Sequence, residues 1–205
     1  ISLDEICSIM SRFPADKVEK FLHDLAFRGF LLPEGLPGLP EFYRVSIIVP
    51  VRNRPREIRS CLRSLQDLEF PKEKLEVVVV DDASSDNTPD VISSFPVRLV
   101  RLPERRQASF CRNIGARKAR GEILAFLDSD CVADPLWLRE LLPAFGNPRV
   151  GAVGGLVDSV STETTLQRYE QVRSSLRVAV RWERSSRENP FLYIPSCNLL
   201  VKREL

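Results

Sequence analysis

The chain contains few glycines, and they form neither of the common phosphate-binding loops. Only 9 of the 205 residues are glycine. No G-x-G-x-x-G follows the first predicted strand, and no G-x-x-x-x-G-K-[ST] occurs anywhere. A dinucleotide-binding fold and a P-loop are therefore disfavoured, because both need glycine to bring backbone N–H groups against phosphate.

Cysteine clusters, long apolar runs and a strong net charge are also missing. The five cysteines are widely spaced, without a C-x-x-C or a Cys/His cluster, which favours reduced thiols in a cytosolic protein over a zinc site or a disulfide framework. No apolar run approaches the roughly 20 residues that a membrane-spanning helix needs, and no signal peptide is visible. The formal charge of +2 is too small to indicate nucleic-acid binding.

The missing apolar runs and signal peptide indicate the cellular location of the protein. We expect a cytoplasmic protein, and membrane association is not supported within this chain. The start at Ile1 and the abrupt end at Leu205 suggest a fragment of a longer protein. Membrane association through a region beyond Leu205 therefore stays open.

Two acidic clusters stand directly after apolar runs. Residues 76–80 (EVVVV) are followed by Asp81 and Asp82, and residues 123–127 (ILAFL) by the triplet DSD at 128–130. Continuous apolar runs of this kind are typical of buried parallel strands, and open α/β sheets bind ligands at the carboxyl ends of their strands. A single Asp there is commonly a helix cap, but two pairs predict a ligand site that includes a divalent cation.

From Tyr43 onward, predicted strands alternate with predicted helices. The strands are expected at residues 45–51, 75–80, 97–101, 122–127 and 150–157. The helices are expected at residues 55–67, 85–95 and 108–119, with a further helix that begins at residues 134–135. This alternation predicts an α/β fold with a mostly parallel sheet flanked by helices.

The first 42 residues are predicted to form a separate unit and a linker. Two helical patterns and a short apolar strand in residues 1–32 suggest a winged-helix-like module. Residues 33–42, which include PEGLPGLP, are predicted to be a semi-rigid linker. Residues 1–40 carry four Lys/Arg against six Asp/Glu, a balance unsuited to a nucleic-acid backbone.

Three stretches, in the correct order, resemble glycosyltransferase family 2, the inverting GT-A enzymes. They are VSIIVPVRNRPREIRSCLRSL, EVVVVDDASSDNT and ARKARGEILAFLDSD, and the resemblance covers about residues 43–205. It implies a metal-dependent hexosyltransferase that moves a hexose from a UDP-sugar to a hydroxyl acceptor and inverts the anomeric carbon. The implied cofactor is Mg²⁺ or Mn²⁺.

The resemblance also implies a donor-binding role for particular residues. Pro50 and Val51 would contact the nucleotide, and Asp82 would hydrogen-bond the uracil edge. Arg112 matches a family position near the donor, although a surface salt bridge explains it equally well. Asp128 would face the ribose and the sugar. Asp130 would ligate the metal that bridges the diphosphate, which agrees with the preference of hard cations for carboxylate and phosphate oxygens.

The sequence departs from the family pattern at two of these motifs. Ala83 replaces the usual glycine after the Asp pair, and Arg54 stands where many members carry Glu after Asn. The family's catalytic base is a carboxylate in an E-D motif that follows an acceptor-side strand. Residues 193–203 resemble that strand, so the base is expected beyond Leu205 and the catalytic residue stays unknown.

A narrower resemblance concerns the acceptor. Residues 3–32 resemble the C-terminal half of a PqqD-like domain, which recognises precursor peptides, and a helical cap on the sheet is the alternative. A PqqD-like unit ahead of a family 2 transferase is the arrangement in mycofactocin-system glycosyltransferases, whose motifs VPVR-[ND]-RP, RYE-x-VRS and YIP are similar here. The acceptor implied is the peptide-derived redox cofactor mycofactocin.

Two other functions are compatible with parts of the sequence. A peptide-binding or scaffold protein could keep a vestigial transferase fold. A nucleotidyltransferase would share the sheet and the metal carboxylates, but such enzymes usually open with a glycine-rich loop after the first strand. Residues 50–54 (PVRNR) contain no glycine.

Overall fold

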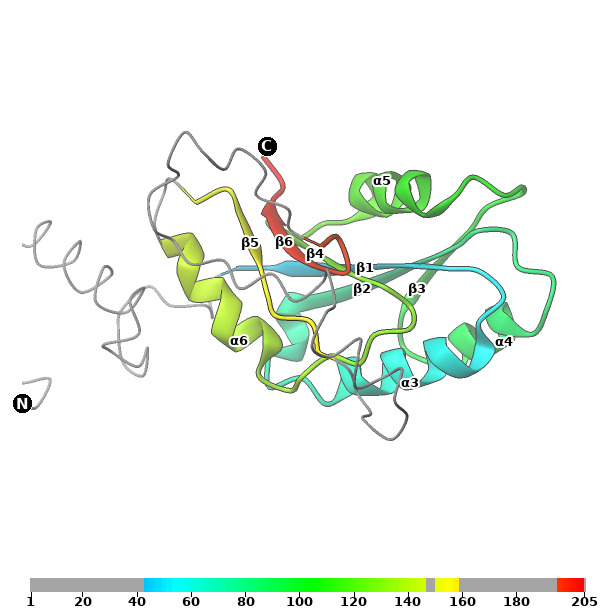
Figure 1. The fold of residues 1–205 in the computed structure, drawn as a ribbon, viewed down its shortest axis with the longest axis horizontal. Coiled ribbons are helices and arrows are strands. Elements are labelled where there is room, and N and C mark those ends of the chain that lie inside the picture. The colour runs from blue at the N-terminus through cyan, green and yellow to red at the C-terminus, as the bar shows by residue number, and fades with distance from the viewer. Residues whose placement is uncertain (1–42, 147–149, 159–194, 205) are drawn as a thin grey trace, which may run out of the picture.

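A computed structural model describes residues 43–146, 150–158 and 195–204 of the chain. The predicted PqqD-like module at 1–32 and the predicted linker at 33–42 lie outside the described residues. The described part is a twisted sheet with helices on both faces (Figure 1).

In the described part of the chain, the sheet has six strands in the order β3-β2-β1-β4-β6-β5. The parallel part consists of β1 (Val45–Val51), β2 (Leu75–Asp81), β3 (Arg98–Arg101) and β4 (Ile123–Leu127). Two antiparallel strands complete it, β6 (Asn198–Lys202) and β5 (Ala152–Gly154). The mostly parallel α/β sheet expected from the sequence is confirmed.

The strand predicted at 150–157 is much shorter in the structure and runs antiparallel to β6. Glycines interrupt this segment, and a Cβ added at Gly155 would lie 2.5 Å from Nδ2 of Asn198. Past the three paired residues, the N–H of Gly155 still donates to the carbonyl of Asn198 at 3.2 Å, and glycine leaves room there for the Asn198 side chain.

Within the described residues, a group of helices covers one face of the sheet and a single helix covers the other (Figure 1). The first group is α3 (Pro55–Gln66), α4 (Thr88–Ser93) and α6 (Trp137–Leu141), which η3 (Leu142–Gly146) continues. A further 3₁₀ turn, η2 (Lys72–Lys74), leads into β2. In α3 the apolar residues Ile58, Leu62 and Leu65 recur at helical spacing and are buried, which pins this helix to the main core.

The opposite face is covered by α5 (Ala108–Lys118), which lies very close to the sheet. A Cβ added at Gly115 would lie 2.4 Å from Cγ2 of Ile48 in β1. Only glycine permits this separation, because any side chain would force the helix away. The contact fixes the helix that carries Arg112 one turn before Gly115.

The strand register brings the two acidic clusters to one edge. β1 lies between β2 and β4, with Val51 opposite Asp81 and Ile48 opposite Phe126. The backbone N–H of Asp82 donates to the carbonyl of Val51 at 2.9 Å, which extends the pairing one residue past β2. Asp82 and the DSD triplet therefore flank the carboxyl end of β1 from its two sides.

Candidate active site

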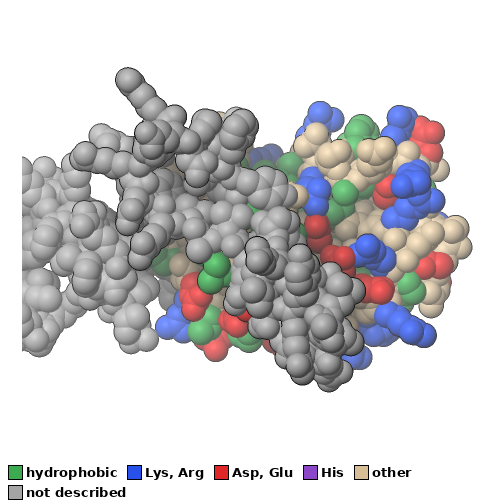
Figure 2. Space-filling view, viewed as in Figure 1, with side chains coloured by type: hydrophobic (Ala, Val, Ile, Leu, Met, Phe, Trp, Pro, Cys, Tyr) green, Lys and Arg blue, Asp and Glu red, His purple; other side chains and the backbone are tan. Residues whose placement is uncertain are grey.

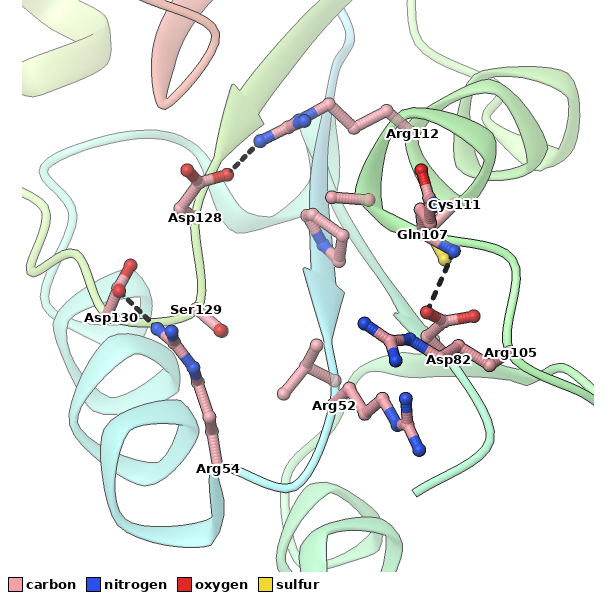
Figure 3. Close-up of a pocket in the computed structure, with 13 residues that line it drawn as sticks. Arg52, Arg54, Asp82, Arg105, Gln107, Cys111, Arg112, Asp128, Ser129 and Asp130 are labelled. Atoms are coloured by element: carbon pink, nitrogen blue, oxygen red, sulfur yellow. Dashed lines mark hydrogen bonds and ion pairs between the residues drawn. The ribbon is translucent and has the colours of Figure 1, made fainter.

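A pocket with a volume of ≈ 400 Å³ opens at the carboxyl ends of β1, β2 and β4. The six residues to which the sequence assigns donor or metal binding all line it: Pro50, Val51, Asp82, Arg112, Asp128 and Asp130. In Figure 3, Asp82 lies on one side of the β1 tip, and Asp128 and Asp130 lie on the other. The structure thus brings both acidic clusters to a single cavity.

Each aspartate of the DSD triplet forms an ion pair with an arginine from a different segment (Figure 3). Nη2 of Arg112, on α5, pairs with Oδ1 of Asp128. Nη1 of Arg54, in the loop between β1 and α3, pairs with Oδ2 of Asp130. The second pair is more open, since the side chains of Arg54 and Asp130 are 47% and 49% exposed, against 18% and 34% for Arg112 and Asp128.

Asp82 holds the loop that precedes α5. Its Oδ1 accepts a hydrogen bond from the backbone N–H of Arg106 at 2.6 Å, and its Oδ2 accepts one from the N–H of Gln107 at 3.0 Å. Gln107 has a φ of 72°, a left-handed conformation that costs free energy in a residue with a side chain. The carboxylate of Asp82 therefore shapes this wall of the pocket whether or not a ligand is present.

Asp81 shapes the turn that follows β2. It is fully buried, and its Oδ1 accepts a hydrogen bond from the N–H of Ser84 at 3.1 Å while Nε of Arg101 lies 3.3 Å from Oδ2. The turn passes through Ala83, whose φ is 54°. This left-handed conformation explains why glycine is usual at the position in the family that the sequence resembles.

The loops after β1 and β2 brace each other through Asn53. Its backbone N–H donates to Oγ of Ser84 at 2.9 Å, and its Oδ1 accepts from the N–H of Ser85 at 2.9 Å. Next to it, the N–H of Arg54 donates to Oγ1 of Thr88 at 3.0 Å. These contacts fix the backbone from which the Arg54 side chain reaches toward Asp130.

Four arginines and three aspartates line the pocket, so its walls carry a small positive excess. Sequence reasoning missed Arg52 and Arg105, whose only signal was basic charge in the loops beside β1 and α5. Nε of Arg52 and Nε of Arg112 are buried without a hydrogen-bond partner in the described part of the protein. Unpaired guanidinium N–H groups in a cavity suit an anionic ligand that accepts hydrogen bonds.

Outside the pocket, basic and acidic side chains are interspersed over the visible part of the face drawn in Figure 2. No extended patch of one sign is visible in that part. This agrees with the formal charge of +2.

Cys111 lines the pocket but is poorly suited to nucleophilic chemistry. Burial raises the pKa of its thiol to about 12, and the nearby Asp82 carboxylate adds to the increase. The thiolate is the reactive form of cysteine. Cys61 and Cys131 also have thiol pKa values raised to about 12, mainly by burial. All four cysteines of the described residues are free thiols, as the sequence predicts.

Trp137 is a packing residue. It is buried in the main core, and its Nε1 donates to Oδ1 of Asn198 at 2.8 Å. Nδ2 of Asn198 in turn donates to the carbonyl of Leu156 at 2.8 Å. The Asn198 side chain thus ties α6 to the end of β5, and Trp137 stays away from the pocket lining.

The pocket fits a divalent cation that brings its own ligands. Asp128 and Asp130 offer the carboxylate oxygens that Mg²⁺ and Mn²⁺ accept. Among the residues that the structure describes, no three His, Cys, Asp or Glu side chains cluster to hold a metal. A cation here would therefore need diphosphate oxygens and water to complete its coordination, which is the usual arrangement for Mg²⁺ with nucleotides.

Fold and pocket together define a class. A mostly parallel sheet whose ligand cavity lies at the carboxyl ends of its strands, with a D-x-D triplet at the tip of β4, is the GT-A type of nucleotide-sugar transferase fold. The described residues contain no helix with the length and apolar character needed to cross a bilayer.

The sequence comparisons give the family. The profile of glycosyl transferase family 2 matches residues 46–204, and the chain belongs to this family. It is 34% identical over 133 residues to glycosyltransferase AglE of Haloferax volcanii, which covers 62% of this chain and 44% of that protein. It is 29% identical over 170 residues to the pre-mycofactocin glycosyltransferase of Mycobacterium tuberculosis, which covers 81% of this chain and 35% of that protein.

A solved structure agrees with the family assignment. The mannosyltransferase PcManGT from Pyrobaculum calidifontis, in complex with GDP-Man and Mn²⁺, matches with a TM-score of 0.55 and 31% identity. The match covers 68% of this chain and 43% of the mannosyltransferase chain. The present chain thus spans less than half of the length of all three of these relatives.

Proposed function

We propose that this chain is the donor-binding part of an inverting, metal-dependent hexosyltransferase that uses a UDP-sugar and transfers the hexose to a hydroxyl acceptor. The observation that carries the proposal is the single pocket that Asp82, Asp128 and Asp130 share with two arginines whose Nε atoms are buried and unpaired. Such a cavity offers acceptors for a base and ribose, and cationic donors for a diphosphate.

The donor would lie across the tip of β1. Pro50 and Val51 would contact the nucleotide, and Asp82 would present its carboxylate to the uracil edge while still accepting its two backbone hydrogen bonds. A carboxylate has lone pairs for about four hydrogen bonds, so both tasks are compatible. Arg112 would bond the phosphates through its free Nε, and Asp128 would face the ribose and the sugar.

Asp130 would hold Mg²⁺ or Mn²⁺ next to the diphosphate. A bound cation stabilises the negative charge that develops on the leaving diphosphate. Arg112 would contribute to the same stabilisation from α5, because a fixed guanidinium needs no reorganisation when the charge appears. The general base that deprotonates the acceptor is expected beyond Leu205, so we assign it to none of the three pocket aspartates.

The proposed acceptor is the peptide-derived cofactor mycofactocin. This is supported by the match to a pre-mycofactocin glycosyltransferase over 81% of this chain. It is also supported by the likeness of residues 3–32 to a PqqD-like module. Transfer of labelled hexose to pre-mycofactocin, but not to unrelated peptides, by the full-length parent protein is the expected result.

Calorimetric titration of this chain with UDP and Mn²⁺ tests the donor site. We expect metal-dependent binding of UDP that Asp130→Asn weakens by about tenfold or more, because removing one carboxylate ligand removes a principal protein contact to the cation. A protein that binds neither UDP nor GDP in the presence of Mn²⁺ would contradict the proposal and favour the vestigial-scaffold alternative.

A GDP-sugar is the second candidate donor, because the matching mannosyltransferase structure contains GDP-Man. Parallel titrations with UDP and GDP separate the two. Tighter binding of UDP supports the UDP-sugar, whereas tighter binding of GDP would transfer the proposal to a GDP-hexose.

A further inference from the structure

The ion pair between Arg54 and Asp130 places a positive charge of the chain where the proposed metal would bind. Arg54 is also one of the positions at which the sequence departs from the family pattern. Its backbone is fixed by the hydrogen bond to Thr88 and by the helix bond from the N–H of Ile58 to its carbonyl at 3.0 Å. Only the side chain is therefore free to change partner.

We infer that Arg54 is a positioning residue that neutralises Asp130 in the ligand-free protein and transfers to the donor diphosphate when nucleotide and metal bind. The inference rests on the proposed function, since it takes Asp130 as the metal ligand. It adds that the metal site is closed by an internal cation until a diphosphate draws that cation away.

The ion pairs of Asp128 and Asp130 differ in their exposure to water, and this difference indicates that the arginine exchange occurs at Asp130. Arg112 and Asp128 are the less exposed pair, with exposed fractions of 18% and 34%. Arg54 and Asp130 are each about half exposed, at 47% and 49%. Ion pairs that water reaches contribute little free energy, so the Arg54 pair is the easier one to break.

A diphosphate is a better partner for Arg54 than a single carboxylate. The guanidinium fork matches phosphate oxygens in a bidentate manner, and a diphosphate carries more negative charge than Asp130. When Arg54 transfers, both oxygens of Asp130 become available to a divalent cation. No covalent bond changes, and the exchange only redistributes charges that are already present.

Cooperative binding follows from this exchange. Without nucleotide, a cation must displace Arg54 from Asp130 and then remain beside its positive charge, so metal alone binds weakly. With the diphosphate bound, Arg54 is engaged elsewhere and the same carboxylate attracts the cation. Because such coupling is reciprocal, metal must raise nucleotide affinity by the same factor.

Binding of Mn²⁺ alone tests the inference, measured from the electron paramagnetic resonance signal of the free ion without nucleotide. We expect Arg54→Gln to bind Mn²⁺ about three- to tenfold more tightly than the unsubstituted chain, because it removes one ion pair and a neighbouring positive charge. Arg54→Lys keeps the charge and is expected to stay within about twofold of the unsubstituted chain.

Two further variants identify the cause of any change. Arg105→Gln also removes one positive charge from the pocket lining, but on the side of Asp82 (Figure 3). A smaller gain in Mn²⁺ affinity is therefore expected for this variant. Asp130→Asn, alone and combined with Arg54→Gln, is expected to abolish Mn²⁺ binding. Binding of UDP without metal should weaken in Arg54→Gln, because the variant has lost the guanidinium that would bind the phosphates.

The outcomes are distinguishable. Equal Mn²⁺ affinity in Arg54→Gln and the unsubstituted chain, with binding lost in Asp130→Asn, would overturn the role of Arg54 and leave the proposed metal site intact. Equal gains in Arg54→Gln and Arg105→Gln would also overturn it, since general pocket charge would then explain the effect. Mn²⁺ binding that survives Asp130→Asn would remove the metal site of the proposed function itself.

Discussion

Replacing Asp82 tests whether this residue shapes the pocket as well as binding the donor. Its carboxylate accepts backbone hydrogen bonds from Arg106 at 2.6 Å and from Gln107 at 3.0 Å, and the residue is only 6% exposed. Hydrogen bonds to a charged group contribute about 1.5–3 kcal/mol each. Asp82→Asn keeps one acceptor oxygen and turns an N–H₂ group toward the other backbone donor, so we expect a loss of about 2 kcal/mol.

Urea unfolding followed by circular dichroism measures this loss in the absence of ligand. With a denaturant slope of about 2 kcal/mol per M, the midpoint should fall by about 1 M urea. Asp86→Asn is the control, because an exposed Asn can still accept the hydrogen bond from the N–H of Thr88. The hydrogen bond to Thr88 lowers the pKa of Asp86, so the midpoint of this control should fall, but much less than that of Asp82→Asn. An unchanged midpoint for Asp82→Asn, together with lost UDP binding, would show that Asp82 acts on the ligand alone and refute the structural role.

Three further predictions follow from backbone geometry and thiol burial. Gly115→Ala should destabilise the fold by about 1–3 kcal/mol in urea unfolding, since its Cβ would lie 2.4 Å from Cγ2 of Ile48; a neutral result would contradict the close helix packing. Ala83→Gly should raise stability by up to about 1 kcal/mol by relieving the φ of 54°, and a loss of stability would argue against that conformation. Burial raises the pKa of the Cys61 and Cys111 thiols from 9.0 to about 12, so the stability that depends on the protonated thiols is complete below pH 9 and is lost as the pH rises toward 12. The free energy of unfolding from urea titrations above pH 9 should therefore fall by up to about 1.4 kcal/mol per pH unit for each thiol, whereas a flat profile would refute the shift.

Local sequence patterns were enough to predict β1 and α3, because the same patterns determine how these two elements pack. The apolar run of β1 was expected at 45–51 and is found at Val45–Val51, and the helix expected at 55–67 is found at Pro55–Gln66. β1 buries a continuous run and α3 buries a helical pattern, so in both elements propensity and packing favour the same structure. The position of the DSD triplet at the end of β4 follows from the same reasoning.

Elements with weak patterns differ more from expectation. The helix expected at 85–95 is reduced to Thr88–Ser93, because Asp86 accepts the N–H of Thr88 in a turn and Pro89 then lies in the first helical turn. The strand expected at 150–157 has three paired residues. In both places the sequence shows the right element, but side-chain hydrogen bonds and glycine set its length.

The arginine pairs of the pocket could not be predicted, since they join distant parts of the chain. Arg54 and Asp130 are separated by 76 positions, and Arg112 and Asp128 by 16. From sequence, Arg54 was only a departure from the family pattern. Its partner depends on the order β2-β1-β4, which places the loop after β1 beside the triplet after β4. Tertiary topology, and not local chemistry, decides which charges meet.

Backbone strain concentrates around the same pocket, and this bears on how the site recognises its ligand. In the described part of the chain, the non-glycine residues with positive φ are Asn53, Ala83 and Gln107. They lie in three of the loops that border the cavity: after β1, after β2 and before α5. Such conformations cost about 1–3 kcal/mol each and persist only where surrounding contacts over-determine them.

Those contacts are the two hydrogen bonds between Asn53 and the Ser84–Ser85 turn, and the bonds that the Arg106 and Gln107 backbone donates to Asp82. The walls of the pocket are therefore preformed before any donor arrives, while the exposed Arg54 side chain remains adjustable. A preformed wall reduces the ordering cost of binding a nucleotide. Removing one of these hydrogen bonds should therefore weaken nucleotide affinity, even at a position that touches no ligand. Ser84→Ala removes the Oγ that accepts the N–H of Asn53. This variant should show lower UDP affinity in calorimetry, with unchanged affinity for Mn²⁺ alone. Equal UDP affinity in that variant would show that loop preorganisation contributes nothing to donor binding.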